Sequence, residues 1–128
     1  MKLKFLGAAQ TVTGSKTILE LGRITILVDS GLYQGVDKLE KFNEKSLDIP
    51  PSTIDYVFLT HAHLDHCGYL PKLVHDGFNG TIFCTKPTKD LVELILIDSV
   101  KIQEYEVKEG SRSEYLYNDE DVVRTLSM

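Results

Sequence analysis

The chain has 128 residues, of which 42% are hydrophobic and 26% are charged. This length is typical of a single domain, and the composition excludes intrinsic disorder as a description of the whole chain. The net charge of −5 excludes nucleic-acid binding through overall positive charge, so such binding would need a metal or a local basic patch. The most apolar stretch, residues 91–97, contains Glu93 and is far shorter than the ~20 apolar residues of a membrane span.

The first 28 residues predict three strands. Residues 2–6 alternate as a short strand; their lysines and apolar neighbours faintly resemble a signal peptide, but the apolar part is shorter than the ~7–15 residues required. Residues 7–15 are rich in Gly, Ala and Thr and predict a loop. The β-rich runs at residues 16–21 and 23–28 are separated by Gly22, which predicts a hairpin with a tight turn.

The middle of the chain predicts a helix and then a strand. Apolar residues recur at helical spacing among Lys and Glu over residues 36–42, which indicates a short amphipathic helix. Pro50 and Pro51 interrupt the chain. Residues 55–60 form an almost continuous apolar run, which predicts a strand covered on both faces.

The second half of the chain predicts mostly helix. We expect a helix over residues 70–77 that stops at Gly77, a strand over 81–84, and a long, largely buried helix over 87–108. Asn118, followed by three carboxylates, predicts the start of a last helix. Strands that come first and then alternate with helices indicate an α/β (α+β) layered sheet with helices on at least one face.

One short segment carries most of the metal-binding side chains. His61, His63, Asp65 and His66 are four candidate ligands within six residues, directly after the apolar strand. In an extended segment His61 and His63 point to the same side and can share one metal ion, while Asp65 and His66 can reach a second. Three of the four histidines of the chain lie here, which makes a merely decorative role improbable.

Four other polar residues have plainer interpretations. Asp29, at the end of an apolar strand, is either a turn residue or a carboxylate that orients a histidine, and the pattern leaves both open. His75 is expected to interact favourably with a helix dipole near a helix C-terminus rather than to bind metal. Cys67 and Cys84 form no C-x-x-C pair, so we expect reduced thiols and a cytoplasmic protein.

Four segments of the chain resemble the sequence motifs of a known family. Residues 60–68, THAHLDHCG, resemble the H-x-H-x-D-H signature of the metallo-β-lactamase superfamily. Three further segments resemble motifs of its β-CASP branch, namely GAAQTVTGS at 7–15, VDSGLYQG at 28–35 and GYLPKL at 68–73. Because these segments also agree in order and spacing, the chain is identified as a member of that branch.

The resemblance implies a fold, an activity and a ligand set. The branch includes RNA-processing nucleases with an αββα sandwich, in which a metal-bridged hydroxide attacks a phosphodiester. By resemblance, His61 and His63 would bind a first zinc ion, and Asp65 and His66 a second. Asp65 is also the candidate catalytic residue, and Asp29 would support the site from the neighbouring strand.

The resemblance also implies what the chain does not contain. The later histidines, the bridging aspartate, the β-CASP insertion and the second sheet have no counterpart among these residues. We therefore expect residues 1–128 to be the N-terminal portion of a metallo-β-lactamase-like domain, with one mixed sheet and helices on one face. One hypothesis is a part of a zinc-dependent ribonuclease that is inactive alone; another is a non-catalytic or oligomerising metal-binding module. A hydrolase of the same fold that acts on a thioester or lactam is a third.

The expected partners follow from these hypotheses. RNA is the expected substrate of the parent protein, and no membrane association is expected. Half of a sandwich would leave one sheet face open, and we expect a homo-oligomer through that face. Its apolar side chains are expected from these residues or their alternates on the same strands: Leu3, Phe5, Ile18, Ile24, Ile26, Val57 and Leu59.

Overall fold

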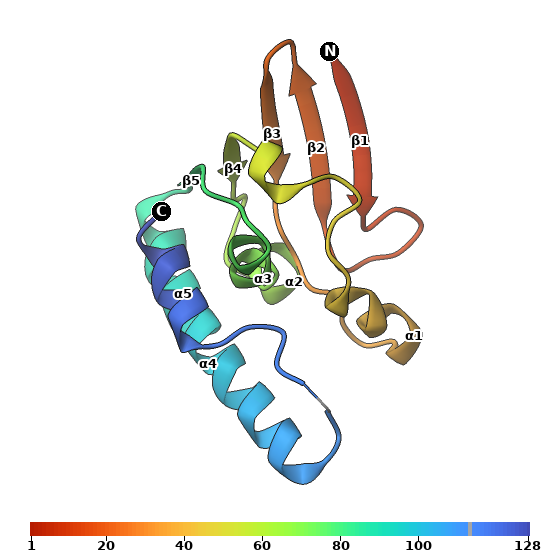
Figure 1. Ribbon diagram of the computed structural model, residues 1–128, viewed down its shortest axis with the longest axis vertical. Coiled ribbons are helices and arrows are strands. Elements are labelled where there is room, and N and C mark those ends of the chain that lie inside the picture. Colours follow the sequence, from red (N-terminus) through yellow and green to blue (C-terminus); the bar gives the residue numbers. More distant parts are fainter. Residues whose placement is uncertain (113) are drawn as a thin grey trace.

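The structure, a computed structural model, describes residues 1–112 and 114–128. The described residues contain a five-stranded mixed sheet in the order β1-β2-β3-β4-β5 (Figure 1). Neighbours β1, β2 and β3 are antiparallel, whereas β4 and β5 continue the sheet in parallel. The strands are β1 (Lys2–Gly7), β2 (Lys16–Leu21), β3 (Ile24–Val28), β4 (Tyr56–Phe58) and β5 (Thr81–Phe83). The predicted α/β class with one mixed sheet is confirmed.

The turn between β2 and β3 follows from a local sequence rule. Leu21 pairs with Ile24, which leaves Gly22 and Arg23 as a two-residue loop. Gly22 has a φ of 62°, a conformation that glycine adopts without steric cost. The predicted hairpin is therefore confirmed.

Helices fill the connections after β3. They are α1 (Asp37–Glu40), which continues into a 3-10 helix (Lys41–Glu44), a second 3-10 helix (Pro51–Thr53), α2 (Leu64–Cys67), α3 (Leu70–His75), α4 (Lys86–Glu109) and α5 (Asp119–Leu126). The short helices α2 and α3 make the crossover between the parallel strands β4 and β5. The C-terminal residue returns to the sheet, because the N–H of Ile82 in β5 donates to the carbonyl of Met128.

The ends of the two longer helices carry regular caps, of which the sequence predicted only the start of α5 at Asn118. At the start of α4, the Thr85 side chain accepts from the N–H of Thr88. Gly110 ends α4 in the left-handed region, with a φ of 80°. At the start of α5, Asn118 and Asp121 form a reciprocal capping box.

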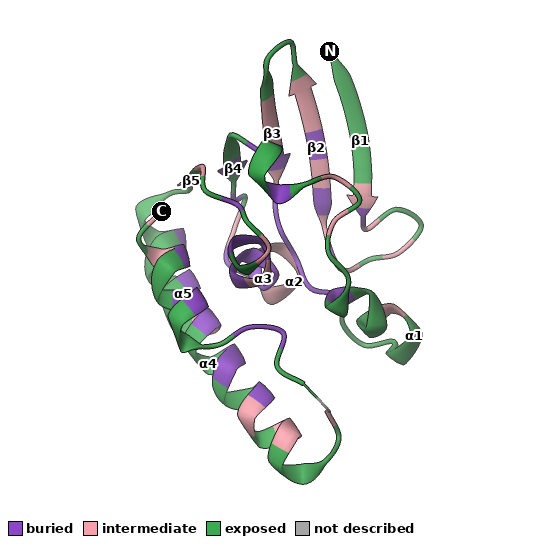
Figure 2. Cartoon of the chain, viewed as in Figure 1, coloured by how far each residue is buried: buried purple, intermediate pink, exposed green. Residues whose placement is uncertain are grey.

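The two faces of the sheet are covered very differently (Figure 2). Ile18, Leu27 and Val57 pair across neighbouring strands, face the helices and have no exposed surface. The residues that alternate with them along the strands point to the opposite face. The apolar residues exposed on that opposite face are Leu3, Phe5, Leu21, Ile24, Tyr56, Phe58 and Phe83. We call this second side of the sheet the open face.

Two expectations about the sheet need correction. Ile18 and Val57 do not lie on the open face, because strand alternation turns them toward the helices. Leu59, just beyond β4, is also buried. The run at 55–60 is not covered on both faces, because Tyr56 and Phe58 are 36% and 42% exposed.

The expectation of a largely buried helix α4 is also wrong. Buried side chains recur along one stripe of the helix, at Val92, Leu96 and Val100, where α4 meets the core. Leu94 is more than half exposed because it lies on another side of the helix from this stripe. Tyr105 is also more than half exposed, in the C-terminal half of α4 that extends beyond the sheet (Figure 1). No helix in the described part of the chain has the length and apolar character needed to cross a membrane.

Candidate metal centre

The candidate site lies where two parallel strands end. Because β3 and β4 are parallel, the residues that follow them, Asp29 and Thr60, meet at the same edge of the sheet. One carboxylate oxygen of Asp29 accepts from the Thr60 N–H at 2.8 Å, and the other accepts from the Thr60 hydroxyl at 2.8 Å. Asp29 is 3% exposed and has a φ of 60°, a conformation that Asp tolerates better than most residues. This carboxylate is therefore rigidly held behind the histidine segment.

Backbone hydrogen bonds hold the histidine segment against the loop that follows β3. The N–H groups of Ser30 and Leu32 donate to the carbonyls of His66 and Leu64, at 2.8 and 3.2 Å. The N–H of Ser15 donates to the carbonyl of Asp65 at 3.0 Å. An added Cβ at Gly31 would collide with the backbone of Asp65, so the close approach requires glycine there.

The three imidazoles of the segment lie next to one another. The ring centroid of His61 is 4.7 Å from that of His63 and 4.1 Å from that of His66. The Nε2 atom of His66 is 3.5 Å from Oδ2 of Asp65. The local expectation that these side chains converge at one edge of the sheet agrees with this geometry.

Hydrogen-bond chemistry determines which nitrogen of two imidazoles is free. An ionised Asp29 only accepts, so the single hydroxyl hydrogen of Thr60 points to Asp29 and the Thr60 oxygen accepts from Nδ1 of His61, 2.8 Å away. Nδ1 of His66 likewise donates to Oδ2 of Asp29, at 2.8 Å. In the neutral tautomers, both histidines therefore keep a lone pair on Nε2.

This donor set fits a metal ion. The Nε2 lone pair of His66 and the Oδ2 atom of Asp65 face each other, and neither supplies a hydrogen, so a cation between them would satisfy both. Imidazole nitrogens together with a carboxylate are ligands that suit zinc. Among residues 1–112 and 114–128, no three His, Cys, Asp or Glu side chains are already arranged as a coordination shell. Binding an ion would therefore require side-chain movements.

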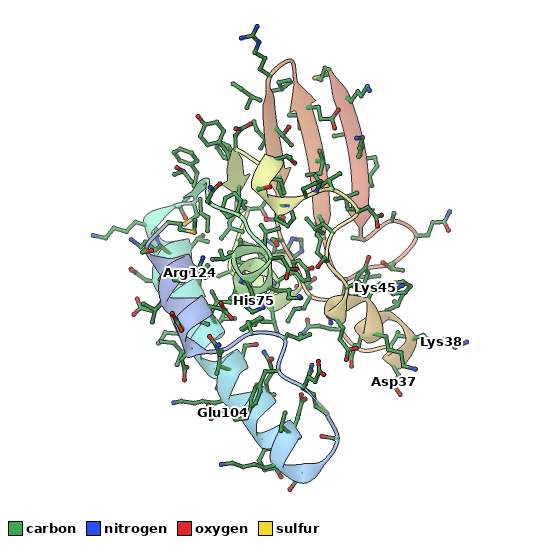
Figure 3. The ribbon with its side chains drawn as sticks, in the orientation of Figure 1. Asp37, Lys38, Lys45, His75, Glu104 and Arg124 are labelled. Atoms are coloured by element: carbon green, nitrogen blue, oxygen red, sulfur yellow. The ribbon has the colours of Figure 1, made fainter. Side chains whose placement is uncertain are left out.

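The remaining histidine and the neighbouring cysteine have other surroundings. His75 ends α3, and its Nδ1 lies 3.2 Å from Oδ2 of Asp121 on α5 (Figure 3). Cys67 is buried, and its thiol donates to the Ala62 carbonyl. Burial, followed by the carboxylates of Asp29 and Asp65, raises the pKa of the Cys67 thiol to about 12. A thiolate ligand at Cys67 is therefore disfavoured.

Thr60 is a site residue that the sequence interpretation missed. It connects Asp29 to His61 and so couples the two strand ends. Its position in the sequence could have indicated this role, because Thr60 is a hydroxyl residue at the end of a strand and immediately before the first histidine.

Comparison with known proteins identifies the family. The family model described as the metallo-beta-lactamase superfamily matches residues 13–108. The chain is 41% identical to "Ribonuclease TTHA0252" of Thermus thermophilus over 81% of this chain and 24% of that protein. It is 38% identical to "Transcription termination factor FttA" of Methanococcus maripaludis, over 93% of this chain and 18% of that protein. The chain thus spans about a quarter or less of the length of these relatives.

A eukaryotic relative agrees with this assignment, and a solved structure shares the fold. The chain is 34% identical to "Cleavage and polyadenylation specificity factor 73" of Drosophila melanogaster, over 98% of this chain and 18% of that protein. A solved B3 metallo-beta-lactamase matches the fold with a TM-score of 0.50 and 19% identity, over 71% of this chain and 32% of that chain. The chain therefore belongs to the metallo-beta-lactamase superfamily and, within it, to the β-CASP branch that its motifs resemble.

Proposed function

We propose that this chain contributes part of the active site of a zinc-dependent phosphodiesterase that cleaves RNA. The observation that carries the proposal is the convergence of His61, His63 and His66 beside Asp65, with Asp29 holding His66 from behind. The named relatives, a ribonuclease and a cleavage and polyadenylation factor, favour RNA over a thioester or lactam substrate.

Each residue of the site has a separate role in this proposal. His61 and His63 bind one zinc ion, and Asp65 and His66 bind a second. Asp65 is also the candidate catalytic residue because it lies at the reacting centre. Asp29 accepts a hydrogen bond from Nδ1 of His66, so that Nε2 of His66 remains available to a metal ion. The Thr60 hydroxyl oxygen accepts from Nδ1 of His61 and leaves Nε2 of His61 available in the same way. Bound zinc would supply an activated water and charge stabilisation for a phosphodiester, which an acidic chain of net charge −5 cannot offer by itself.

The 128-residue chain is expected to be inactive alone. It offers about two ligands to each ion, whereas a catalytic zinc site typically has about three protein ligands. An incompletely held ion does not position a water for attack, and positioning is a large part of rate enhancement. We therefore expect weak zinc binding and no zinc-dependent ribonuclease activity.

Zinc titration with matched variants tests the site. Calorimetry on the purified chain should show zinc binding that is weakened at least tenfold by His63→Ala. His75→Ala is the matched control, because His75 lies outside the site and contacts Asp121, and it should leave the affinity unchanged. Equal zinc affinity in wild type and His63→Ala would overturn the ligand assignment.

A ribonuclease assay tests the proposed incompleteness. Single-stranded RNA incubated with the chain and zinc should be cleaved no faster than RNA in buffer with zinc alone. Robust cleavage that is lost in His63→Ala would show that the 128 residues already form a complete active site.

The open face indicates how the domain is completed. In the proposal, residues 1–128 form the N-terminal portion of an αββα sandwich, and a second sheet belongs against the open face. Exposed aromatic rings support this, since Phe58 and Phe83 stack at 5.0 Å with Tyr56 beside them. A contiguous apolar face of this kind is unusual on a monomer. The 128-residue chain alone is therefore expected to cover it with a second copy.

Sedimentation velocity at several concentrations tests this association. We expect a dimer or a larger homo-oligomer that dissociates on dilution. A strictly monomeric mass at high protein concentration would contradict the proposed pairing through the open face.

A further inference from the structure

Lys16 is a buried cation without a counter-charge. Its side chain is only 3% exposed, and its Nζ donates to the carbonyl of Gly31 at 2.6 Å. The rings of Tyr33 and Tyr69 lie 5.0 and 4.5 Å from Nζ. No carboxylate in the described part of the chain is within ion-pair distance of it. Burial lowers the pKa of Lys16 to about 8, because desolvation disfavours the charged form.

A cavity of about 370 Å³ adjoins this lysine. It lies between the β1–β2 loop and the short helices after β3, and Lys16, Tyr33 and Tyr69 are part of its lining. Lys45, labelled in Figure 3, contributes a second cation and lies 4.8 Å above the ring of Phe42. Asp48 is the carboxylate of the lining, so cations outnumber anions there. The volume falls within the range of ~300–1,000 Å³ that is typical of small-molecule sites.

The chemistry of the lining points to one class of ligand. Two ammonium groups favour an anion, and a dianionic phosphate would compensate both more fully than a single carboxylate would. Aromatic walls favour a flat ring, because such rings pack against one another in offset or edge-to-face contacts. We propose that the cavity lined by Lys16, Lys45 and the aromatic side chains binds a small phosphate monoester carried on a planar ring, such as a mononucleotide.

This cavity is separate from the candidate metal centre. None of His61, His63, Asp65 and His66 is part of its lining. The backbones of Ser15 and Gly31, which are hydrogen-bonded to each other, connect the cavity to the metal centre. The Gly31 carbonyl accepts from Lys16 of the cavity, while the Ser15 N–H donates to the carbonyl of Asp65. Ligand binding in the cavity therefore requires neither zinc nor ribonuclease activity.

The test is a titration of the purified chain in a chelator-containing, zinc-free buffer. Adenosine 5′-monophosphate is the probe, adenosine is the ring alone and inorganic phosphate is the anion alone, each followed by NMR chemical shifts. We expect the monophosphate to bind at least tenfold more tightly than adenosine or phosphate, with shifts at Tyr33, Phe42 and Tyr69. Equal affinity for adenosine and its monophosphate, or no binding at millimolar concentration, would overturn the proposal.

Two lysine variants test the location of the site, and the exposed one remains informative if the buried one fails to fold. Lys16→Met should weaken monophosphate binding at least tenfold, and Lys45→Met, at an exposed position that does not threaten the core, should weaken it severalfold. Lys72→Met is the matched control, because Lys72 pairs with Asp76 outside the cavity, and it should bind normally. Retained affinity in a folded Lys45→Met variant would count against the proposal whatever the stability of Lys16→Met.

His63→Ala separates this inference from the proposed function. The variant should lose zinc affinity but keep monophosphate affinity. Loss of monophosphate binding in His63→Ala would instead place the ligand at the metal centre and overturn the inference.

Discussion

The two faces of the sheet differ although they are built from the same strands. In β3, Leu27 has no exposed surface, whereas Ile24, three residues earlier, is 43% exposed. In β4, Val57 is fully buried between the half-exposed Tyr56 and Phe58. Both faces are apolar, so composition does not distinguish them. The helices after β3 cover one face only, and the apolar side chains of the open face stay exposed.

The covered face also supports the candidate metal centre. Its core residues Ile18 and Leu27 belong to one buried cluster with Ala62 of the histidine segment and the adjoining Cys67. Burying one such side chain fully contributes about 1.5–3 kcal/mol. We therefore expect changes on the covered face to affect folding and the site, and changes on the open face to affect association.

The largest expected effect is on the covered face. Leu27→Ala should lower the free energy of unfolding by about 2–5 kcal/mol, because it removes buried methyl groups and leaves a cavity. The measurement is urea denaturation followed by circular dichroism. Ile24→Ala on the open side of the same strand is the control and should cost less than about 1 kcal/mol. Equal losses in the two variants would contradict the difference in burial between the two faces.

The next effect concerns the buried Lys16 at the start of β2. Its folded-state pKa of about 8 lies below the ordinary value of 10.5, so the unfolded chain binds more protons between these pH values. Stability should therefore rise with pH across this window, by about 3 kcal/mol from this group.

Comparison with Lys16→Met isolates that contribution. The difference in the free energy of unfolding between wild type and variant should change by about 3 kcal/mol from pH 8 to pH 10.5, in favour of wild type at high pH. Denaturation in phosphate-free buffer measures it. A constant difference would show that Lys16 is well solvated.

A smaller effect is expected at the strand ends. Asp29→Asn should weaken zinc binding by about 10–100-fold, because an amide no longer holds His66 and Thr60 with a charged acceptor. Asp37→Asn in the exposed helix α1 should leave zinc affinity unchanged. Calorimetric titration of both variants is the measurement, and equal affinities would refute the supporting role of Asp29.

The smallest effect on folding is expected on the open face. Phe5 is 64% exposed, so Phe5→Ser should change the free energy of unfolding of the monomer by less than about 0.5 kcal/mol. The same change should weaken self-association measured by sedimentation. Unchanged association would place the contact between copies elsewhere, and exposed apolar residues of α4 such as Leu94 would become the next candidates.

Prediction from the sequence succeeded where the signal was local. The hairpin at Gly22 and the helix start at Asn118 each depend on a few neighbouring residues. The rings of His61, His63 and His66 lie close together, as their spacing after a strand predicts, and their role as metal ligands stays a prediction. Prediction failed for the burial of α4 and of residues 55–60, because an apolar run shows what could be buried, not what covers it.

Strand alternation, turn chemistry and motif spacing are short-range properties, so most of the elements, the histidine segment and the family resemblance could be recognised in the sequence alone. Only the tertiary structure decided that Asp29 supports His66, because that contact requires β3 and β4 to be parallel neighbours. It also decided that Ile18 faces the helices and that Lys16 is buried between Tyr33 and Tyr69. Such contacts join residues far apart in the chain, and their positions depend on how all the elements pack together.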